Sequence, residues 1–245
     1  MKSAMCSNFI DTYKVAALFY IIVKMKGIYL AFEGGEGFGK STQAKILFEK
    51  LKEKFPKRKI ILTREPGGSS IAEEVREIIL TSRKDEQIQL LTEAYLFAAA
   101  RAQSLRESVV PVLEEGGIVI SDRTFYSSIA YQGFGRELGW KKVWKINQEA
   151  VGKIKPDLVY LFDGDPKIGL DRICKNKRET NRLDKEKLEF HKRVRKGFLF
   201  LCDKEPKRFV TIDGCSSIEK QSEIIWAQFC RFNRRSAYDS AKMVQ

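Results

Sequence analysis

A glycine-rich segment, GGEGFGKS at residues 34–41, constrains the fold of this chain more than any other feature. Gly34, Gly39, Lys40 and Ser41 meet the pattern G-x-x-x-x-G-K-[ST], with an apolar run before them and a helical pattern after them. Glycine lets backbone N–H groups turn inward, and a helix N-terminus adds partial positive charge. The segment therefore predicts a phosphate-binding loop, with Lys40 on the β- and γ-phosphates of a nucleoside triphosphate and Ser41 on Mg²⁺.

The predicted ligand of this loop is ATP, with Mg²⁺ as cofactor. The residues expected to contact the nucleotide are Gly34, Gly35, Glu36, Gly37, Phe38, Gly39, Lys40, Ser41 and Thr42. Motors, GTPases and kinases share such a loop, so it does not by itself separate hydrolysis from transfer. No guanine-specifying N-K-x-D tetrapeptide is present, which disfavours a GTPase.

Short apolar runs alternate with helical patterns along the chain, as they do in a mostly parallel sheet covered by helices on both faces. The predicted strands are residues 27–32, 59–63, 117–121, 157–162 and 209–212. The predicted fold class is therefore α/β, a P-loop NTPase fold in which helices flank a five-stranded parallel sheet and a short lid is attached. We expect one domain at 25–232, an extension at 1–24 outside it, and a polar tail at 233–245.

Three sets of apolar residues recur at helical spacing, and each set is expected to pack into the core. They are Ala44, Leu47, Phe48, Leu51 and Phe55; Ile71, Val75, Ile78 and Ile79; and Phe190, Val194, Phe198 and Leu201. Residues 87–115 are predicted to form one long helix that ends at Gly116, with a possible kink at Pro111.

Composition narrows the classes of partner. The 45 Lys and Arg residues exceed the 32 Asp and Glu residues, and the net charge of +13 suits nucleic acid, a membrane surface or phosphorylated small molecules.

Five cysteines without a C-x-x-C pair argue against a disulfide framework or zinc site and favour the cytoplasm. The apolar run at 15–23 is far shorter than the roughly 20 residues that span a bilayer, so no membrane partner is expected. A targeting or anchoring segment is the alternative interpretation of residues 1–24. The single histidine, His191, is interpreted as solvated on a charged helix face.

Two arginines directly follow predicted strands, at the sheet edge where ligands bind in open α/β folds. Arg64 opens the segment REPGG, and Arg123 follows Asp122. Because a guanidinium group forms paired hydrogen bonds with phosphate, two such groups indicate a second anion beside the triphosphate. The alternative is a pair of structural salt bridges, with Glu65 and Asp122. Asp122 is predicted to hold Mg²⁺ directly or through water, and its alternative role is to cap the helix that begins near Phe125.

Behind FEGGEGFGKST, the motifs TREPGG, LFAAAR, DRTFYSSIAYQG and NRLD occur in an order that resembles the thymidylate kinase (dTMP kinase) family. The resemblance runs from about Met25 to about Ile225. It implies ATP-dependent phosphorylation of dTMP to dTDP with Mg²⁺, by a cytoplasmic homodimer that binds small-molecule nucleotides and no nucleic acid.

The same resemblance implies a set of substrate-binding residues: Glu36, Arg64, Glu65, Phe97, Arg101, Arg123, Ser128, Tyr131 and Gln132. Within this set, Arg64 and Arg123 would grip the dTMP phosphate, and Glu36 would contact the sugar 3′-hydroxyl. A cis peptide bond before Pro66 is also implied.

The base pocket implied by the resemblance consists of residues on two helices. Phe97 would stack on thymine, and Arg101, Ser128 and Gln132 would bind the base or line its pocket. Spacings of four residues place Phe97 with Arg101, and Ser128 with Gln132, on shared helix faces. Tyr131 would block a 2′-hydroxyl, and plain core packing is the alternative for Phe97.

A short basic segment, KNKRETNRLD at 175–184, is predicted to be the lid that brings positive charge to the transferring phosphoryl group. Thymidylate kinases carry their catalytic arginine either in the phosphate loop or, chiefly in bacteria, in the lid. The loop here has Gly37 at that position, so the resemblance assigns the arginine to the lid. The predicted catalytic residues are Lys40, Arg123, Arg178 and Arg182, with Arg178 ahead of Arg182.

Two positions depart from the family pattern. Thr124 stands where a tyrosine usually follows the Asp-Arg pair, and Phe38 is bulkier than the usual small residue. Neither position carries a charged role, so we expect altered affinity and retained activity.

Two alternative functions stay open. A deoxynucleoside kinase shares the loop and lid, but its uncharged acceptor would leave Arg64 and Arg123 without a phosphate. A basic nucleic-acid-binding P-loop ATPase would account for the charge, although no aromatic-basic RNA-binding signature, zinc finger or clear helix-turn-helix is present.

Overall fold

The computed structural model describes residues 27–81, 85–175 and 181–242. Its centre is a sheet of five parallel strands in the order β2-β3-β1-β4-β5. The strands are β1 (Ile28–Gly34), β2 (Ile60–Arg64), β3 (Ile118–Asp122), β4 (Leu158–Asp163) and β5 (Phe209–Asp213). All five predicted strands are confirmed, each ending one or two residues later than expected.

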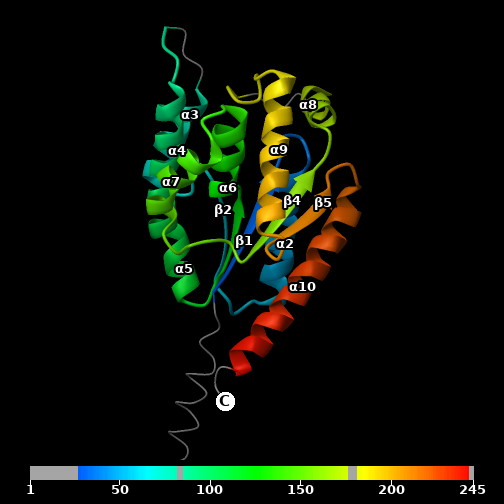
Figure 1. Cartoon of the computed structure of the whole chain (residues 1–245). Coiled ribbons are helices and arrows are strands. Elements are labelled where there is room, and N and C mark those ends of the chain that lie inside the picture. The colour runs from blue at the N-terminus through cyan, green and yellow to red at the C-terminus, as the bar shows by residue number, and fades with distance from the viewer. Residues whose placement is uncertain (1–26, 82–84, 176–180, 243–245) are drawn as a thin grey trace, which may run out of the picture.

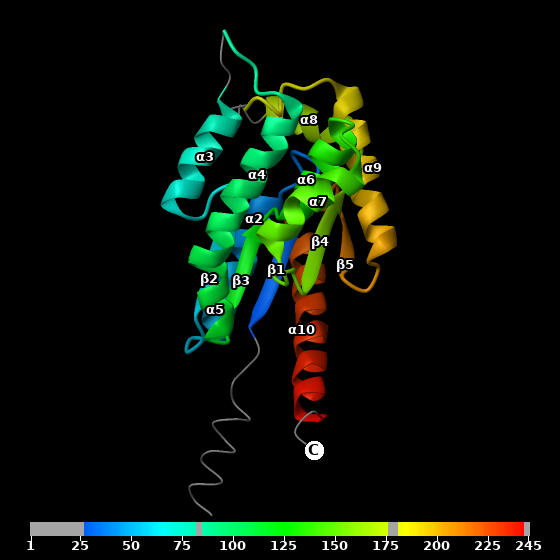
Figure 2. The ribbon, with the colours of Figure 1, turned by 60° about the vertical axis from the view of Figure 1, so that its left-hand side comes forward.

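Helices cover both faces of the sheet (Figures 1 and 2). The α-helices are α2 (Lys40–Lys54), α3 (Ser70–Leu80), α4 (Leu90–Ser104), α5 (Val110–Glu114), α6 (Phe125–Ser128), α7 (Trp140–Val151), α8 (Pro166–Lys175), α9 (Leu188–Lys204) and α10 (Ile218–Lys242). Two π-helical segments, η1 (Leu105–Val109) and η2 (Ile129–Gly135), join α4 to α5 and extend α6.

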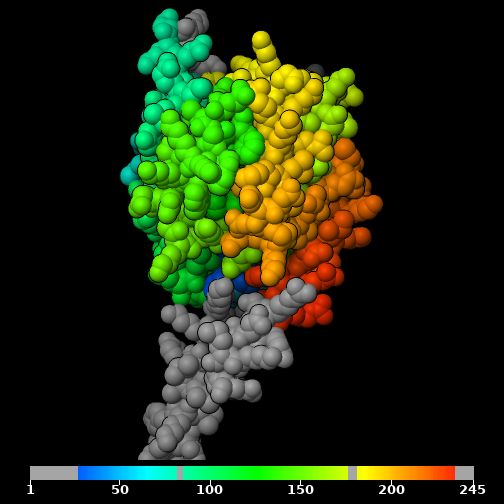
Figure 3. All heavy atoms as spheres, viewed as in Figure 1, coloured from blue at the N-terminus to red at the C-terminus, as the bar shows by residue number. Residues whose placement is uncertain are grey.

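The alternation of side chains along β1 assigns these helices to the two faces. Leu30 and Phe32 pack with residues of α2 and α10, whereas Ala31 lies in the cluster formed with α4, η2, α7 and α9. In the space-filling view, the green and yellow atoms of η2, α7 and α9 cover the second face (Figure 3). The core therefore has two layers, one on each side of the sheet.

The long helix predicted over residues 87–115 is found as α4, η1 and α5 in succession. Its central turn is π-helical and ends one residue before Val110, the residue that precedes Pro111. Proline has no N–H to donate to the preceding turn, and a local widening of the helix accommodates that loss. The predicted break at Pro111 is thus a change of helix type.

Two of the predicted core positions are wrong. Ile79 is fully buried, but Ile71 and Ile78 are 53% and 42% exposed. Helical spacing predicts which residues share a face, and α3 turns only part of that face toward the neighbouring helix α4. The interpretation of His191 as solvated is also wrong. Its side chain is buried, at 4% exposure, because α9 packs it near residues of the phosphate loop.

The ends of the predicted domain stay a prediction. The extension at 1–24 lies outside the described residues, and α10 continues past Phe232 to Lys242. Across the described parts of the chain, no helix combines the length and apolarity that crossing a bilayer requires.

Candidate active site

The carboxyl ends of three adjacent strands converge on one cavity of about 480 Å³. β1 leads into the glycine-rich loop, β2 ends at Arg64 and β3 ends at Asp122. The parallel register places Asp122 beside both Arg64 and Phe32, so the loop and both predicted arginine positions meet at one edge. This is the edge at which open α/β sheets bind ligands.

The loop adopts a backbone conformation that only glycine accommodates at Gly37. Gly37 has a φ of 78°, and a Cβ atom there would lie 2.0 Å from the carbonyl oxygen of Gly169 in α8. Both the positive φ and the close contact exclude a larger residue. An arginine at position 37 is therefore sterically incompatible with this structure. The assignment of the catalytic arginine to the lid stays a prediction.

The departure at Phe38 has a structural explanation. Its ring is 2% exposed, and it fills the space beside three glycines, Gly164, Gly169 and Gly214. A Cβ atom at Gly164 or Gly214 would approach the ring to 2.5 or 2.4 Å. The larger loop residue is accommodated because its neighbours have no side chains.

Lys40 is buried at the start of α2, and its Nζ donates a hydrogen bond of 2.5 Å to the carbonyl of Gly35. Burial, together with the nearby Arg123, lowers the pKa of Lys40 to about 8, although Glu36 and Asp122 oppose the shift. The ammonium group is thus held at the loop in an environment that favours a multiply charged anion.

Ser41 and Asp122, the predicted Mg²⁺ ligands, are in direct contact: the serine hydroxyl donates to Asp122 Oδ2. The alternative role of Asp122 as a helix cap is not found, because Thr124 is the N-cap of α6 and accepts from the Tyr126 amide at 3.4 Å. Asp122 also makes no salt bridge with Arg123, whose carboxylate partner is Glu36.

Arg123, in the wall of the cavity, forms hydrogen bonds with four neighbouring residues. Its guanidinium donates to Glu36 Oε1 at 2.6 Å and to the Tyr131 hydroxyl at 3.2 Å. It also donates to the carbonyl of Gly34 at 3.1 Å and to the Ser127 hydroxyl at 3.0 Å. Although burial opposes its charge, Glu36 and the other neighbouring acidic groups raise the pKa of Arg123 well above its ordinary range. The group is a permanent, oriented cation between the loop and η2.

Arg64, the last residue of β2, and Glu65, directly after it, have different surroundings. Arg64 is exposed and pairs with Glu73 of α3 at 2.9 Å, whereas Glu65 is buried and accepts from Arg101 Nε at 2.6 Å. Burial raises the pKa of Glu65, and Arg101 partly offsets that effect. The Glu65-Pro66 peptide bond is cis, as the resemblance implied.

The predicted base-pocket residues lie together on the cavity wall, which includes Phe97, Arg101, Ser128, Tyr131 and Gln132. Phe97 is 9% exposed and also packs in the core, so both roles considered for it are compatible with its place. Arg101 donates to Ser128 Oγ at 3.1 Å. The two pairs predicted from spacing, Phe97 with Arg101 and Ser128 with Gln132, therefore line the same cavity.

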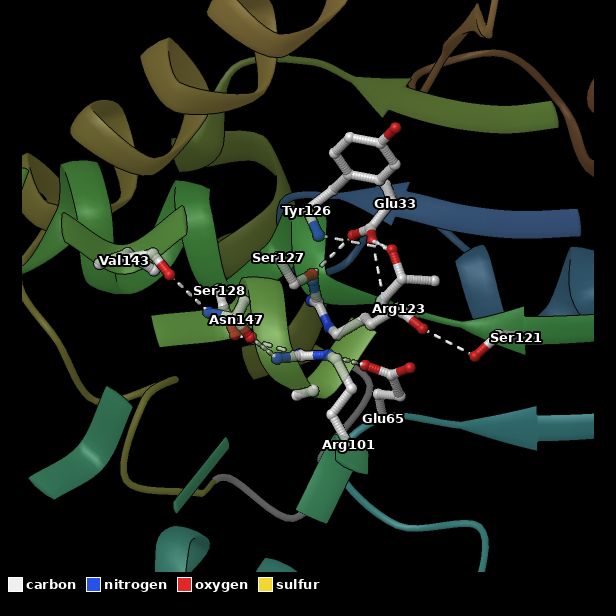
Figure 4. Close-up of polar contacts among 12 residues, drawn as sticks. Glu33, Glu65, Arg101, Ser121, Arg123, Tyr126, Ser127, Ser128, Val143 and Asn147 are labelled. Atoms are coloured by element: carbon white, nitrogen blue, oxygen red, sulfur yellow. Dashed lines mark hydrogen bonds and ion pairs between the residues drawn. The ribbon is translucent and has the colours of Figure 1, made fainter. Parts of the chain in front are cut away.

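Sequence reasoning missed three buried residues that hold these groups in place: Glu33, Glu93 and Asn147. Figure 4 shows Asn147 of α7 accepting from Arg101, on the opposite side of the guanidinium from Glu65. A charged residue inside an apolar strand was the available signal for Glu33. No comparable signal pointed to Asn147 or Glu93, because their partners are distant in the sequence.

Glu33 anchors the turn that carries Arg123 (Figure 4). Its carboxylate accepts from the backbone N–H and the hydroxyl of Thr124, both at 2.7 Å, and from Ser127 Oγ at 2.6 Å. Arg123 has a φ of 75°, a conformation that is uncommon for residues other than glycine. Burial raises the pKa of Glu33 to about 7, against the lowering effect of Arg123 and these hydrogen bonds. Thr124, the second departure from the family pattern, thus supplies two of the three hydrogen bonds.

The lid is only partly described. Arg178 lies outside the described residues, so its predicted role stays a prediction. Arg182 donates from Nε to the carbonyl of Ile79 at 3.1 Å and pairs with the buried Glu93. In this structure Arg182 is thus bound to α3 and α4.

Comparison with known proteins connects this geometry to a family. The family model described as thymidylate kinase matches residues 32–225. The chain is 48% identical over 196 residues to a thymidylate kinase of Lactobacillus helveticus, covering 80% of this chain and 92% of that protein. It is also 48% identical over 198 residues to a thymidylate kinase of a Geobacillus species, with the same coverages.

The chain belongs to the thymidylate kinase family. A crystal structure of thymidylate kinase from Ehrlichia chaffeensis superposes with a TM-score of 0.66 at 30% identity, covering 83% of this chain and 99% of that one. These findings confirm the predicted P-loop NTPase fold with its five-stranded parallel sheet, and the predicted class of nucleoside-monophosphate kinases.

Proposed function

We propose that this protein transfers the γ-phosphoryl group of ATP to dTMP, giving dTDP and ADP. The observation that carries the proposal is the presence of two cationic groups, Lys40 of the phosphate loop and Arg123, in the wall of one cavity. Lys40 suits the β- and γ-phosphates of the donor, and the oriented guanidinium of Arg123 suits the phosphate of an acceptor. The similarity to thymidylate kinases favours dTMP as that acceptor.

In the proposed reaction, an oxygen of the dTMP phosphate forms a bond to the γ-phosphorus of ATP while the bond to the bridging oxygen of ADP breaks. Arg123 and Arg64 would bind the acceptor phosphate, and Glu36 would accept from the sugar 3′-hydroxyl. The contact between Arg123 and Glu36 supports this arrangement, because it places a phosphate ligand next to a sugar ligand. Tyr131, whose hydroxyl donates to Glu36 at 2.8 Å, would close the space beside the sugar.

The oxygen atoms of Ser41 and Asp122 fit a Mg²⁺ ion, because they lie in contact at the loop and Mg²⁺ takes few protein ligands besides phosphates and water. When bound there, the ion would neutralise charge on the β- and γ-phosphates. Ser41 and Asp122 would orient the donor, and Lys40 would hold the charge that develops on the leaving group.

A coupled assay of ADP release tests the proposed function. We expect dTMP to be the best acceptor in a panel with dUMP, dCMP, dGMP, AMP and thymidine. Equal or better turnover of a purine nucleotide would contradict the assignment. Better turnover of thymidine would favour a deoxynucleoside kinase, and salt-dependent DNA binding with DNA-stimulated ATP hydrolysis would favour a nucleic-acid-binding ATPase.

Replacing the lid arginine Arg178 with alanine is expected to lower kcat by about 10³-fold, as loss of an arginine at the transferring phosphoryl group does in related chemistry. The KM for ATP should change much less, because the contact forms mainly in the transition state. The pairing of Arg182 with Glu93 supports Arg178 as the first choice. Steady-state kinetics with saturating dTMP measure both constants.

Lys167→Ala, at an exposed position of α8, is the matched control for loss of a nearby positive charge. It should leave kcat close to the wild-type value. If Arg178→Ala retains the wild-type kcat, the catalytic role passes to Arg182, and Arg182→Ala should then show the loss.

We further propose that the protein is a homodimer that associates through α3 and α4. In the described part of the chain, five of the eight exposed large apolar side chains belong to these helices: Ile71, Ile78, Leu90, Leu91 and Tyr95. Exposed apolar surface of this kind commonly marks an interface. Sedimentation velocity should show a dimer, and a monomer at micromolar concentration would contradict the proposal. A cytoplasmic location stays a prediction.

A further inference from the structure

Within the described part of the chain, the side-chain amide of Gln132, a residue in the wall of the cavity, has a hydrogen-bond partner on only one of its two halves. The residue is fully buried in η2 and forms part of the cavity wall. Its Nε2 donates to Glu93 Oε1 at 2.8 Å, whereas its Oε1 is buried and has no hydrogen-bond partner among the described residues. A buried carbonyl oxygen without a donor is rare in folded proteins and indicates a place where a ligand supplies the donor.

The partner of that amide is an unusual carboxylate. Glu93 lies in the first turn of α4 with no exposed surface, yet two arginines face it from other elements. Arg136, which follows η2, donates to it from two nitrogens at 3.3 Å, and Arg182 from the start of the NRLD segment pairs with it as well. Burial alone would raise its pKa, but Arg136, Gln132 and Arg182 together hold the pKa of Glu93 below its ordinary value.

An ionised carboxylate accepts hydrogen bonds and cannot donate them. The half of the Gln132 amide that faces Glu93 must therefore be the NH₂ group, and the carbonyl must face away from Glu93. The orientation of this amide follows from the charge state of Glu93.

The bases that could enter the pocket differ in what they offer to such a carbonyl. Thymine and uracil carry a hydrogen on N3, which can be donated, whereas N3 of cytosine is an acceptor. Two acceptors facing each other in a buried site would leave both without a donor, which costs affinity. A carbonyl oxygen held opposite N3 of the base would thus accept from thymine or uracil and disfavour cytosine.

We propose that Glu93 is a specificity-determining residue: by orienting the amide of Gln132, it makes the acceptor site select pyrimidines that carry an N3–H. This inference rests on the proposed function, in which Gln132 lies beside the base of the acceptor nucleotide. Glu93 acts through Gln132 and does not touch the substrate, so it is a positioning residue. Its pairing with Arg182 also joins base selection to the C-terminal part of the predicted lid.

The test compares kcat/KM for dTMP, dUMP and dCMP in the wild-type protein and in Glu93→Gln. An amide at position 93 both donates and accepts, so the amide of Gln132 becomes free to turn over. We expect the preference for dTMP over dCMP to fall by about tenfold or more, the typical consequence of one unpaired buried hydrogen-bonding group. The ratio of dTMP to dUMP should stay unchanged, because both bases carry N3–H.

These ratios do not depend on the fraction of folded enzyme, so partial destabilisation of the variant does not affect them. Glu33→Gln is the matched control, because it removes another buried carboxylate, on the phosphate side, and should leave the dTMP to dCMP ratio unchanged. Glu93→Asp keeps the charge and should retain most of the preference. An unaltered ratio in Glu93→Gln would overturn the proposal.

The exchanged pair Glu93→Gln with Gln132→Glu provides a second test that preserves the net charge and the packing. The amide at 93 would donate to the carboxylate at 132, whose second oxygen would still face the base as an acceptor. The preference for dTMP over dCMP should therefore persist, and its loss would overturn the proposal even if Glu93→Gln alone does not fold. Failure of the proposed function would be recognised separately, as absence of dTMP turnover in the wild-type protein.

Discussion

Substituting methionine for Lys40 is expected to lower kcat by about 10²–10³-fold, the usual cost of removing one preorganised electrostatic group from an active site. The lysine side chain is buried at the phosphate loop, and methionine keeps most of its volume while removing the charge. Without that charge the leaving β-phosphate loses a stabilising contact in the transition state. Steady-state kinetics with ATP and dTMP measure the loss.

The same substitution should stabilise the folded protein without nucleotide. The pKa of Lys40 falls from 10.5 to about 8 on folding, so the charged lysine destabilises the folded state at neutral pH. A shift of that size corresponds to about 3 kcal/mol of destabilisation of the folded state at neutral pH. The hydrogen bond from Lys40 to Gly35, which the variant loses, reduces the net gain in stability. Because the folded state releases this proton first, the stability of the wild-type protein rises as pH increases from about 8 to 10.5, and the advantage of the variant shrinks over the same range.

Thermal unfolding at pH 7 and pH 10 measures this difference, and Lys45→Ala, at an exposed position on α2, is the control for loss of a lysine. The wild-type kcat/KM for ATP should also decline above about pH 8, where Lys40 loses its proton in the free enzyme. If Lys40→Met is both less stable than the wild type and as active, the assigned role of Lys40 is wrong.

Replacing Arg123 with lysine should reduce kcat/KM for dTMP by about 10²-fold or more, although the charge is kept. The guanidinium reaches Glu36, Tyr131, Ser127 and the carbonyl of Gly34 from two nitrogens. A single ammonium group cannot span these partners and also grip a phosphate with two parallel hydrogen bonds. We expect a higher KM for dTMP and a lower kcat, with little change in the KM for ATP.

Arg106→Lys serves as the control, because Arg106 donates to backbone carbonyls of α7 and takes no part in the proposed site. It should change thermal stability more than kinetics. If Arg123→Lys retained the wild-type kcat/KM, any cation at this position would suffice, and the acceptor phosphate would have to bind elsewhere.

The local features of this fold were predictable because each depends on neighbours in the sequence. The strands, the loop from Gly34 to Ser41 and its place between β1 and α2 follow from apolar runs and from glycine spacing. The positions of Arg64 and Arg123 at strand ends follow from the same pattern, and the family resemblance was confirmed over most of the chain.

The partners of those residues were not predictable. Arg123 pairs with Glu36 and not with Asp122, and Arg64 pairs with Glu73 and not with Glu65. A salt bridge depends on where side chains lie after the strands have been placed side by side, and adjacent residues on a strand point to opposite faces. The exposure of Ile71 and the burial of His191 have a similar origin, since helical spacing does not say which side of a helix meets the sheet.

By itself, therefore, the sequence of this protein determined that it builds a triphosphate loop at the edge of a parallel sheet, since that motif needs only contiguous residues. Only the tertiary structure decided how the acceptor site is held: Glu33 under Arg123, Asn147 beside Arg101, and Glu93 behind Gln132. Each of these pairs joins segments at least 39 residues apart. A buried charge or amide acquires its orientation from partners that only folding brings within hydrogen-bonding distance.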